Sequence, residues 1–276
     1  MNTPSISVLI TAWNREQYIG EAIDSILASD FQDFEVIVVD DMSEDKTVDI
    51  AAKYAKIDPR IRVYVNEQNL GDYPNRNKAA SYARGKYIKY LDSDDILYKH
   101  CLGLMFESIE QFPEAGFGLC CVPDPKASFP IFLQPRQAYQ EHFSGQGHFN
   151  RAPGSAIIKR EAFESVGGFS GKRMIGDYEL WLKLGRVYPL VKMVTGLYWD
   201  RHHGNQERFS DYAKKNYESL RHSVMLEAFA SKDCPLNEEE KLEILRLEKR
   251  RLYEFRIKSK IHELKGIFKK SQSKQD

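Results

Sequence analysis

Apolar and polar positions in the N-terminal part of the chain follow a repeating order of strand-like and helix-like segments. The strand-like segments are short and apolar, whereas the segments between them place apolar side chains at three- and four-residue intervals, as one buried helical face does. Strand and helix recur at roughly 25 to 30 residues per pair, the spacing of right-handed βαβ units. The pattern therefore predicts an α/β fold with a Rossmann-like, mostly parallel sheet flanked by helices. Its first strands are Ile6 to Thr11, Phe34 to Val39, Ile61 to Val65 and Tyr87 to Leu91.

Capping residues indicate where the helices between these strands begin. Asn14 with Gln17 three residues later resembles a capping box. Ser43 is a candidate N-cap for the next helix. Pro74 suits the first turn of a helix that reaches about Ala83.

A cluster of prolines divides the chain into two halves. It follows a predicted strand at Gly116 to Val122, and neither a helix nor a central strand persists through such a cluster. We therefore expect one half at 1–122 and a second at 123–235. The second half has predicted strands at Ala156 to Lys159, Leu190 to Thr195 and Leu197 to Trp199, and predicted helices at about Arg160 to Val166, Asp177 to Gly185 and Ser210 to Ala230.

A basic helical extension is predicted at 236–276. Asn237 and Glu240 form another capping-box pattern at its start. From Lys249 to Asp276 there are ten Lys and Arg against three Asp and Glu. The basic side chains accompany a discontinuous apolar stripe, which suits an anionic membrane surface. A homodimer contact or packing on the chain's own domain explains the same pattern equally well.

Three carboxylates stand at the end of the fourth strand. Asp92, Asp94 and Asp95 directly follow Tyr87 to Leu91, and ligands of open α/β sheets bind at the carboxyl ends of strands. Two carboxylates one residue apart suit a divalent ion that carries a diphosphate, because Mg²⁺ takes few protein carboxylates and fills its other positions with phosphate oxygens and water. A helix N-cap before a helix at Tyr98 to Gln111 is an equally good interpretation of these residues alone.

Composition excludes several classes of protein. The formal net charge of +0 argues against a general nucleic-acid binder. The glycine-rich fingerprints of dinucleotide-binding and P-loop domains are absent. The 4 cysteines contain no C-x-x-C pair, which favours a reducing compartment. With neither a signal-peptide pattern nor an apolar run of about 18 residues, we expect a cytoplasmic protein, peripheral at the inner face of the membrane if the extension binds lipid.

Four segments resemble the family 2 glycosyltransferases. They are S-V-L-I-T-A-W-N-R-E-Q-Y-I, F-E-V-I-V-V-D-D-M-S-E-D-K-T, N-L-G-D-Y-P-N-R-N-K-A and Y-I-K-Y-L-D-S-D-D, in that order along the chain. The resemblance is strong from Ser5 to about Leu97 and weaker to about Gly204. It implies the GT-A fold, with a nucleotide-sugar-binding half at 1–122 and an acceptor-binding half at 123–235. It also implies transfer of a sugar from a nucleotide diphosphate sugar to a hydroxyl, with inversion and with Mn²⁺ or Mg²⁺.

The resemblance also assigns residues of the donor site. Asp41 matches the acidic residue that accepts a hydrogen bond from the base, whereas Asp40 is expected to stay in the turn. Asp92 is expected to contact ribose or metal, and Asp94 to be the direct metal ligand. The remaining nucleotide-site positions are Thr11, Ala12, Asn14 and Arg76, although a solvent-facing charge on a helix is the default interpretation of Arg76.

Two motifs of the second half match the family as well. In G-D-Y-E-L-W-L-K-L, Asp177 matches the catalytic base that removes the proton of the acceptor hydroxyl. In isolation, acids in the first turn of a helix are the favoured interpretation of Asp177 and Glu179, and the series of matching motifs reverses that preference. Further on, Arg201 matches a diphosphate ligand and His203 a metal ligand, with His202 as the less favoured choice for the metal.

Two other functions compete with a glycosyltransferase. A sugar-phosphate nucleotidyltransferase is disfavoured because T-A-W-N-R-E lacks glycine after the first strand. A non-catalytic glycosyltransferase-like binding module is disfavoured because each acidic position that the mechanism requires is occupied. We expect a uridine diphosphate sugar as donor and a glycan or lipid-linked saccharide as acceptor.

Overall fold

A computed structural model describes residues 3–125, 127–203, 210–251 and 253. The chain divides into two compact units, Met1–Pro235 and Leu236–Asp276. The larger unit includes both predicted halves of the α/β region, and it contains the site discussed below.

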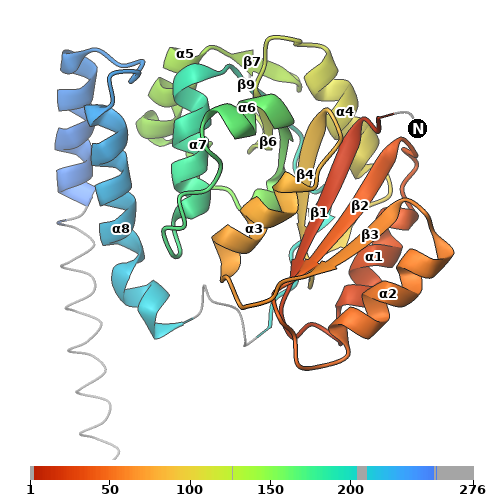
Figure 1. Cartoon of the computed structure of the whole chain (residues 1–276). Coiled ribbons are helices and arrows are strands. Elements are labelled where there is room, and N and C mark those ends of the chain that lie inside the picture. Colours follow the sequence, from red (N-terminus) through yellow and green to blue (C-terminus); the bar gives the residue numbers. More distant parts are fainter. Residues whose placement is uncertain (1–2, 126, 204–209, 252, 254–276) are drawn as a thin grey trace, which may run out of the picture. The chain divides into compact units, whose positions relative to one another are not determined.

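The larger unit is built on an eight-stranded sheet (Figure 1). Its order is β3-β2-β1-β4-β8-β6-β9-β7, and the first four strands are parallel. β8 is antiparallel to both of its neighbours, β4 and β6. The strands of this sheet are β1 (Ile6–Ala12), β2 (Phe34–Asp40), β3 (Ile61–Val65), β4 (Tyr87–Asp92), β6 (Phe117–Cys120), β7 (Ile131–Leu133), β8 (Ala156–Lys159) and β9 (Leu190–Met193).

A second, two-stranded sheet joins segments far apart in the sequence. β5 (Ile96–Leu97) follows the acidic residues after β4, and β10 (Tyr198–Trp199) pairs with it in antiparallel register. The segment that begins with β10 is thereby held beside the end of β4.

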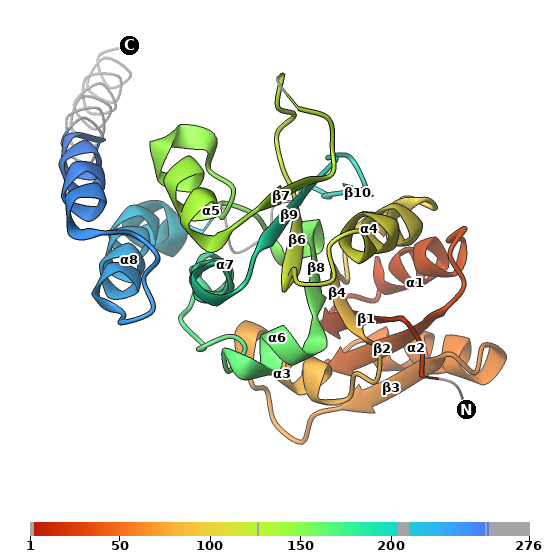
Figure 2. The same cartoon turned by 90° about the horizontal axis from the view of Figure 1, so that it is seen from above.

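Helices cover both faces of the large sheet. Seen from above, α1 and α4 lie on one face and α3 and α6 on the other (Figure 2). The connections from β1 to β2, through α1, and from β2 to β3, through α2, move toward the β3 edge of the sheet. The connection from β3 to β4, through α3, moves back the other way. Because such connections are right-handed, α3 lies on the opposite face from α1. The helices of the larger unit are α1 (Ile19–Leu27), α2 (Thr47–Ile57), α3 (Asp72–Ser81), α4 (Cys101–Glu110), α5 (Pro135–Glu141), α6 (Arg160–Ser165), α7 (Gly176–Val187) and α8 (Asp211–Ala230).

The apolar side chains that mark the predicted strands and helices are buried between the sheet and the helices, where they form the core. All seven residues of β2 are buried, as a strand with helices on both faces requires. The helical face predicted after the first strand is buried in α1 through Ile19, Ala22, Ile23 and Ile26.

Three predicted helix starts are wrong. Asn14 has a left-handed φ of 52°, and α1 begins only at Ile19, so no capping box forms with Gln17. Ser43 lies before the N-cap of α2 and donates instead to the carboxylate of Asp40. α4 begins at Cys101 because residues 96–97 form β5, so Asp95 is not its N-cap.

The second unit is described only in part. Asn237 and Glu240 form the predicted reciprocal capping box at the start of its helix. The basic stretch predicted to contact a membrane or a second copy lies largely outside the described residues. Among the residues that the structure describes, no helix is long and apolar enough to cross a bilayer.

Candidate functional site

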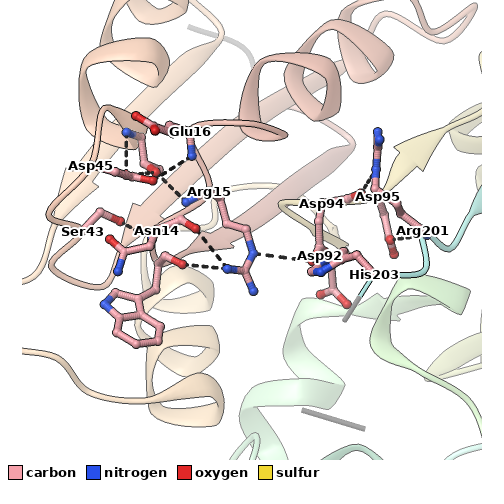
Figure 3. Close-up of polar contacts among 12 residues, drawn as sticks. Asn14, Arg15, Glu16, Ser43, Asp45, Asp92, Asp94, Asp95, Arg201 and His203 are labelled. Atoms are coloured by element: carbon pink, nitrogen blue, oxygen red, sulfur yellow. Dashed lines mark hydrogen bonds and ion pairs between the residues drawn. The ribbon is translucent and has the colours of Figure 1, made fainter. Parts of the chain in front are cut away.

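The candidate site lies at the carboxyl ends of β1 and β4. These strands are neighbours in parallel register, which places Thr11 opposite Asp92. Ala12 at the end of β1 is buried beside Asp40 of β2. The residues from Asp92 to Asp95 form an acidic turn after β4, and the loop after β1 faces this turn (Figure 3).

The acidic turn concentrates negative charge in a partly buried place. The backbone N–H of Asp95 donates to the carbonyl of Asp92, which closes the turn. The carboxylate of Asp95 accepts the backbone N–H of Arg201 at 3.0 Å. Burial first, and then the charges of Asp92 and Asp94, raise the pKa of Asp95 to about 8. A cation bound here would relieve this repulsion.

His203 and Arg15 meet Asp94 from two other segments. Nε2 of His203 lies 2.8 Å from Oδ2 of Asp94, and its ring stacks on Tyr18 with centroids 5.2 Å apart. Nε of Arg15 lies 3.5 Å from the same carboxylate oxygen. His202 pairs instead with Asp200 at 3.6 Å, so His203 is the histidine that faces the acidic turn.

Arg201 is held by the same turn. Its Nε donates to the backbone carbonyl of Asp94 at 2.8 Å, and its guanidinium also pairs with Glu21. The guanidinium carbon lies 5.0 Å from the ring centroid of Tyr18 and 4.8 Å from that of Trp199. The antiparallel pairing of β10 with β5 sets this position, since Arg201 comes two residues after β10.

Arg76 connects the acidic turn to α3. Its guanidinium donates to Asp92 at 2.7 Å and to Asp72 at 2.8 Å. The default interpretation of Arg76 as a solvent-facing charge is wrong, because the residue is only 7% exposed. Its buried Nη1 has no hydrogen-bond partner among the residues that the structure describes.

Asp177 is the second residue of α7 and faces α3. Its Oδ1 accepts the backbone N–H of Tyr178 at 2.7 Å and the hydroxyl of Tyr73 at 3.5 Å. Burial raises the pKa of Asp177 to about 6, while the charge of Arg76 opposes the shift. A carboxylate with this pKa is suited to accept a proton near neutral pH. Glu179, the other acid of this turn, is buried and pairs with Lys172 at 3.0 Å.

The predicted base-contacting residue, Asp41, is already well occupied. Its carboxylate accepts hydrogen bonds from the side chain of Asn66 and from the backbone N–H groups of Leu70 and Gly71, each at 2.8 Å. Two carboxylate oxygens offer about four acceptor positions, so one remains for a ligand. Asp41 thus holds the loop before α3, and Asp40 holds its own turn through Ser43.

The loop after β1 presents Trp13 and Arg15, two residues that the sequence motifs did not single out. Asn14 accepts the backbone N–H of Glu44 and so ties this loop to the one after β2. Its left-handed backbone turns the chain between Trp13, which is 53% exposed, and Arg15 beside Asp94. Trp13 could have been predicted as a site residue because it is an aromatic residue directly after the strand that carries Thr11 and Ala12.

The donor atoms of the acidic turn fit a divalent cation. No group of three or more His, Cys, Asp or Glu side chains converges within the described ranges. The pair of a carboxylate and an imidazole, Asp94 and His203, nevertheless matches an ion that fills its remaining positions from a diphosphate and water. The charge repulsion at Asp95 is the observation of this structure that favours a cation.

A family profile described as glycosyl transferase family 2 matches residues 7–167, more than half of the chain. The chain belongs to glycosyl transferase family 2. A curated relative, the uncharacterized glycosyltransferase EpsJ of Bacillus subtilis, is 38% identical over 215 residues, which cover 73% of this chain and 62% of that protein. In several other family 2 relatives the matched segment spans between 27% and 39% of the protein's length.

Solved structures place this family 2 chain in the GT-A fold. TarS 1-349 of S. aureus, in complex with UDP-GlcNAc, matches with a TM-score of 0.70 at 20% identity and covers 91% of this chain and 73% of its own. The mannosyltransferase PcManGT of Pyrobaculum calidifontis, in complex with GDP-Man and Mn²⁺, matches with a TM-score of 0.60 at 20% identity, covering 83% and 64%. The GT-A fold predicted from the sequence motifs is therefore confirmed.

Proposed function

We propose that this chain transfers a sugar from a nucleotide diphosphate sugar to a hydroxyl, with inversion at the anomeric carbon. One observation carries the proposal. Asp177, a half-buried carboxylate with a raised pKa, faces α3, where Arg76 makes an ion pair with Asp92 of the acidic turn. The candidate base, Asp177, and the candidate diphosphate site at the acidic turn thus lie on two sides of the space where a donor sugar would bind.

Asp177 is proposed as the general base. Of its two carboxylate oxygens, Oδ1 accepts hydrogen bonds from the amide of Tyr178 and from the hydroxyl of Tyr73. Oδ2 accepts no hydrogen bond from the described residues and is the oxygen proposed to take the proton of the acceptor hydroxyl. That hydroxyl attacks the anomeric carbon as the bond to the diphosphate breaks, on the opposite side of the ring, so the configuration inverts.

The acidic turn is proposed to hold Mn²⁺ or Mg²⁺ through Asp94 and His203. When bound, the cation would compensate the negative charge that develops on the departing diphosphate. Arg15 and Arg201 contribute further positive charge around the same turn. Asp92 stays paired with Arg76 and is proposed to contact the ribose or the cation.

The nucleotide is proposed to lie across the end of β1. Thr11, Ala12 and Asn14 form its floor, and the exposed ring of Trp13 offers a face on which a base can stack. Asp41 retains one acceptor position, which suits an N–H on the edge of uracil. A UDP-linked sugar is therefore the proposed donor. The structural neighbours bind UDP-GlcNAc in one case and GDP-Man in the other, so both bases need testing.

The acceptor is proposed to be a hydroxyl of a glycan or of a lipid-linked saccharide, bound by the half at 123–235. The decisive experiment screens nucleotide sugars for release of nucleoside diphosphate, with Mn²⁺ and with EDTA. Cation-dependent release from one donor supports the proposal. Tight nucleotide binding without release from any donor would favour a binding module, and release of pyrophosphate from a nucleoside triphosphate and a sugar phosphate would favour a nucleotidyltransferase.

A further inference from the structure

The side chain of Tyr73 lies between α3 and the first turn of α7, where Asp177 stands. The residue is 8% exposed, and its ring stacks on Phe169 with centroids 5.1 Å apart. A Cβ at Gly176 would lie 2.8 Å from the ring, so this glycine allows the ring to rest directly on the helix terminus. Packing therefore fixes the place of the ring.

The hydroxyl of Tyr73 is directed at Asp177. It donates to Oδ1 at 3.5 Å, its one hydrogen bond within the described part of the chain. A buried phenol needs a polar partner, and here the partner is the proposed base itself.

We propose that Tyr73 is the positioning residue of Asp177: its hydroxyl anchors Oδ1 and so leaves Oδ2 turned toward the acceptor hydroxyl. The inference rests on the proposed function and adds to it a residue that does not touch the reacting atoms. A carboxylate with one oxygen anchored by two donors presents its other oxygen in one geometry, which favours a productive approach.

Several charged or titratable groups face Asp177 from the elements around it. Asp72 and Arg76 act on it from α3, and Tyr217 lies near enough on α8 for the charge of Asp177 to raise its pKa. Within the described residues, Tyr73 is the side chain that donates a hydrogen bond to the carboxylate. Removing this donor destabilises the ionised form, so the pKa of Asp177, already about 6, should rise further.

Tyr73→Phe tests the proposal because it keeps the ring and removes only the hydroxyl. We expect the acidic limb of the kcat/KM profile to move up by about 0.5 to 1 pH unit and kcat on the plateau to fall roughly 3- to 10-fold. Affinity for the nucleoside diphosphate should stay unchanged. Tyr139→Phe is the matched control, since it removes a buried hydroxyl that donates to the carbonyl of Leu182 at 2.7 Å. It should lower the Tm without moving the pH profile.

Two further measurements keep the test decisive. If Tyr73→Phe has the parental profile and rate while Tyr73→Leu is inactive, only the ring matters and the proposal is overturned. ¹³C NMR of carboxyl-labelled aspartates, with the Asp177 signal identified by its loss in Asp177→Asn, reports the titration without any substrate. An unchanged Asp177 titration in Tyr73→Phe also overturns the proposal. Absence of sugar transfer by the parental protein would instead contradict the proposed function, and the NMR result would still stand.

Discussion

Nε2 of His203 lies 2.8 Å from Oδ2 of Asp94, although 109 residues separate the two along the chain. Their contact joins the loop after β10 to the turn after β4, and it brings an imidazole and a carboxylate to one point. The same oxygen of Asp94 also faces Arg15. Asp94 is thus met by side chains from two other segments, the loop after β1 and the loop after β10.

Replacing Asp94 with alanine should abolish both Mn²⁺-dependent nucleotide binding and sugar transfer. Without this carboxylate the proposed cation would lose its ligand, and the charge on the departing diphosphate would lose its compensation. Calorimetric titration of the nucleotide with and without Mn²⁺ measures the effect. His202→Ala is the control, because His202 pairs with Asp200. A variant at Asp94 that keeps its Mn²⁺-dependent affinity would show that another carboxylate holds the cation.

Replacing Asp177 with asparagine should slow transfer roughly 10²- to 10⁴-fold while nucleotide affinity stays nearly constant. Asparagine keeps the shape of the side chain but cannot accept the proton. Single-turnover rates together with nucleotide titrations separate the two effects. Glu179→Gln is the comparison, since Glu179 is engaged by Lys172 and should contribute to stability rather than to proton transfer. Parental rates in the Asp177 variant would place the base elsewhere.

The pH dependence of kcat/KM should have an acidic limb centred at about pH 6. Burial raises the pKa of Asp177 to about 6, so the carboxylate is ionised and able to accept a proton above that pH and is protonated below it. Below the midpoint the rate should fall about tenfold per pH unit, as for one essential base. The Asp177→Asn variant should lack this limb. A midpoint near the ordinary value of 3.8 would contradict the inferred environment of Asp177.

Uridine diphosphate should stabilise the protein against heat more than guanosine diphosphate does in the presence of Mn²⁺, with thymidine diphosphate, which carries the same ring N–H as uridine diphosphate, tested beside them. The single acceptor position left on Asp41 suits one ring N–H. Ligand binding to the folded state raises Tm in proportion to the logarithm of concentration over Kd, so the ranking reads out preference. Stabilisation by guanosine diphosphate alone would argue against a uridine donor.

Replacing Arg76 with methionine should destabilise the fold by about 1 to 3 kcal/mol, less than the loss for a fully buried ion pair, because the carboxylates left behind keep contact with solvent. The guanidinium is buried, whereas its partners Asp72 and Asp92 retain some contact with solvent. Urea unfolding at pH 7 measures the loss. Asp72→Asn is the matched control, because the carboxylate of Asp72 is 58% exposed and its pairing should be worth less than about 1 kcal/mol. Equal losses in the two variants would contradict a central role for Arg76.

Most strands of the large sheet were predictable from the sequence because apolar runs mark them and the fold buries the same runs, whereas β5 and β7 were not predicted. β3 and β8 have the predicted bounds, and β1, β2 and β4 extend one residue further than predicted. Helix starts were less predictable. Asn14 has the residue type of an N-cap, yet its side chain accepts a hydrogen bond from Glu44 in a neighbouring loop. Such a tertiary contact leaves no trace in local spacing.

The proximity of side chains in the site was predictable where a motif places two residues close in sequence, as in the acidic turn. It was not predictable where contacts depend on the three-dimensional fold. Burial of Arg76 follows from the packing of α3 on β1 and β2, which brings its guanidinium over the ring of Tyr90. The approach of Tyr73 to Asp177 spans 104 residues. The local pattern could not show that Asp41 is occupied, because its donors come from the loop before α3.

The pairing of β10 with β5 affects when the acidic turn can be completed during synthesis and where the chain can be joined to another transferase in a chimera. The family profile ends at residue 167, whereas Arg201 and His203 lie beyond it and are held beside the acidic turn by the pairing of Trp199 with Ile96. A nascent chain must therefore emerge from the ribosome beyond residue 203 before the contact between His203 and Asp94 can form. A chimera joined to another transferase at residue 167 would inherit the acidic turn without its own imidazole. A segment exchanged between transferases should therefore include residue 203.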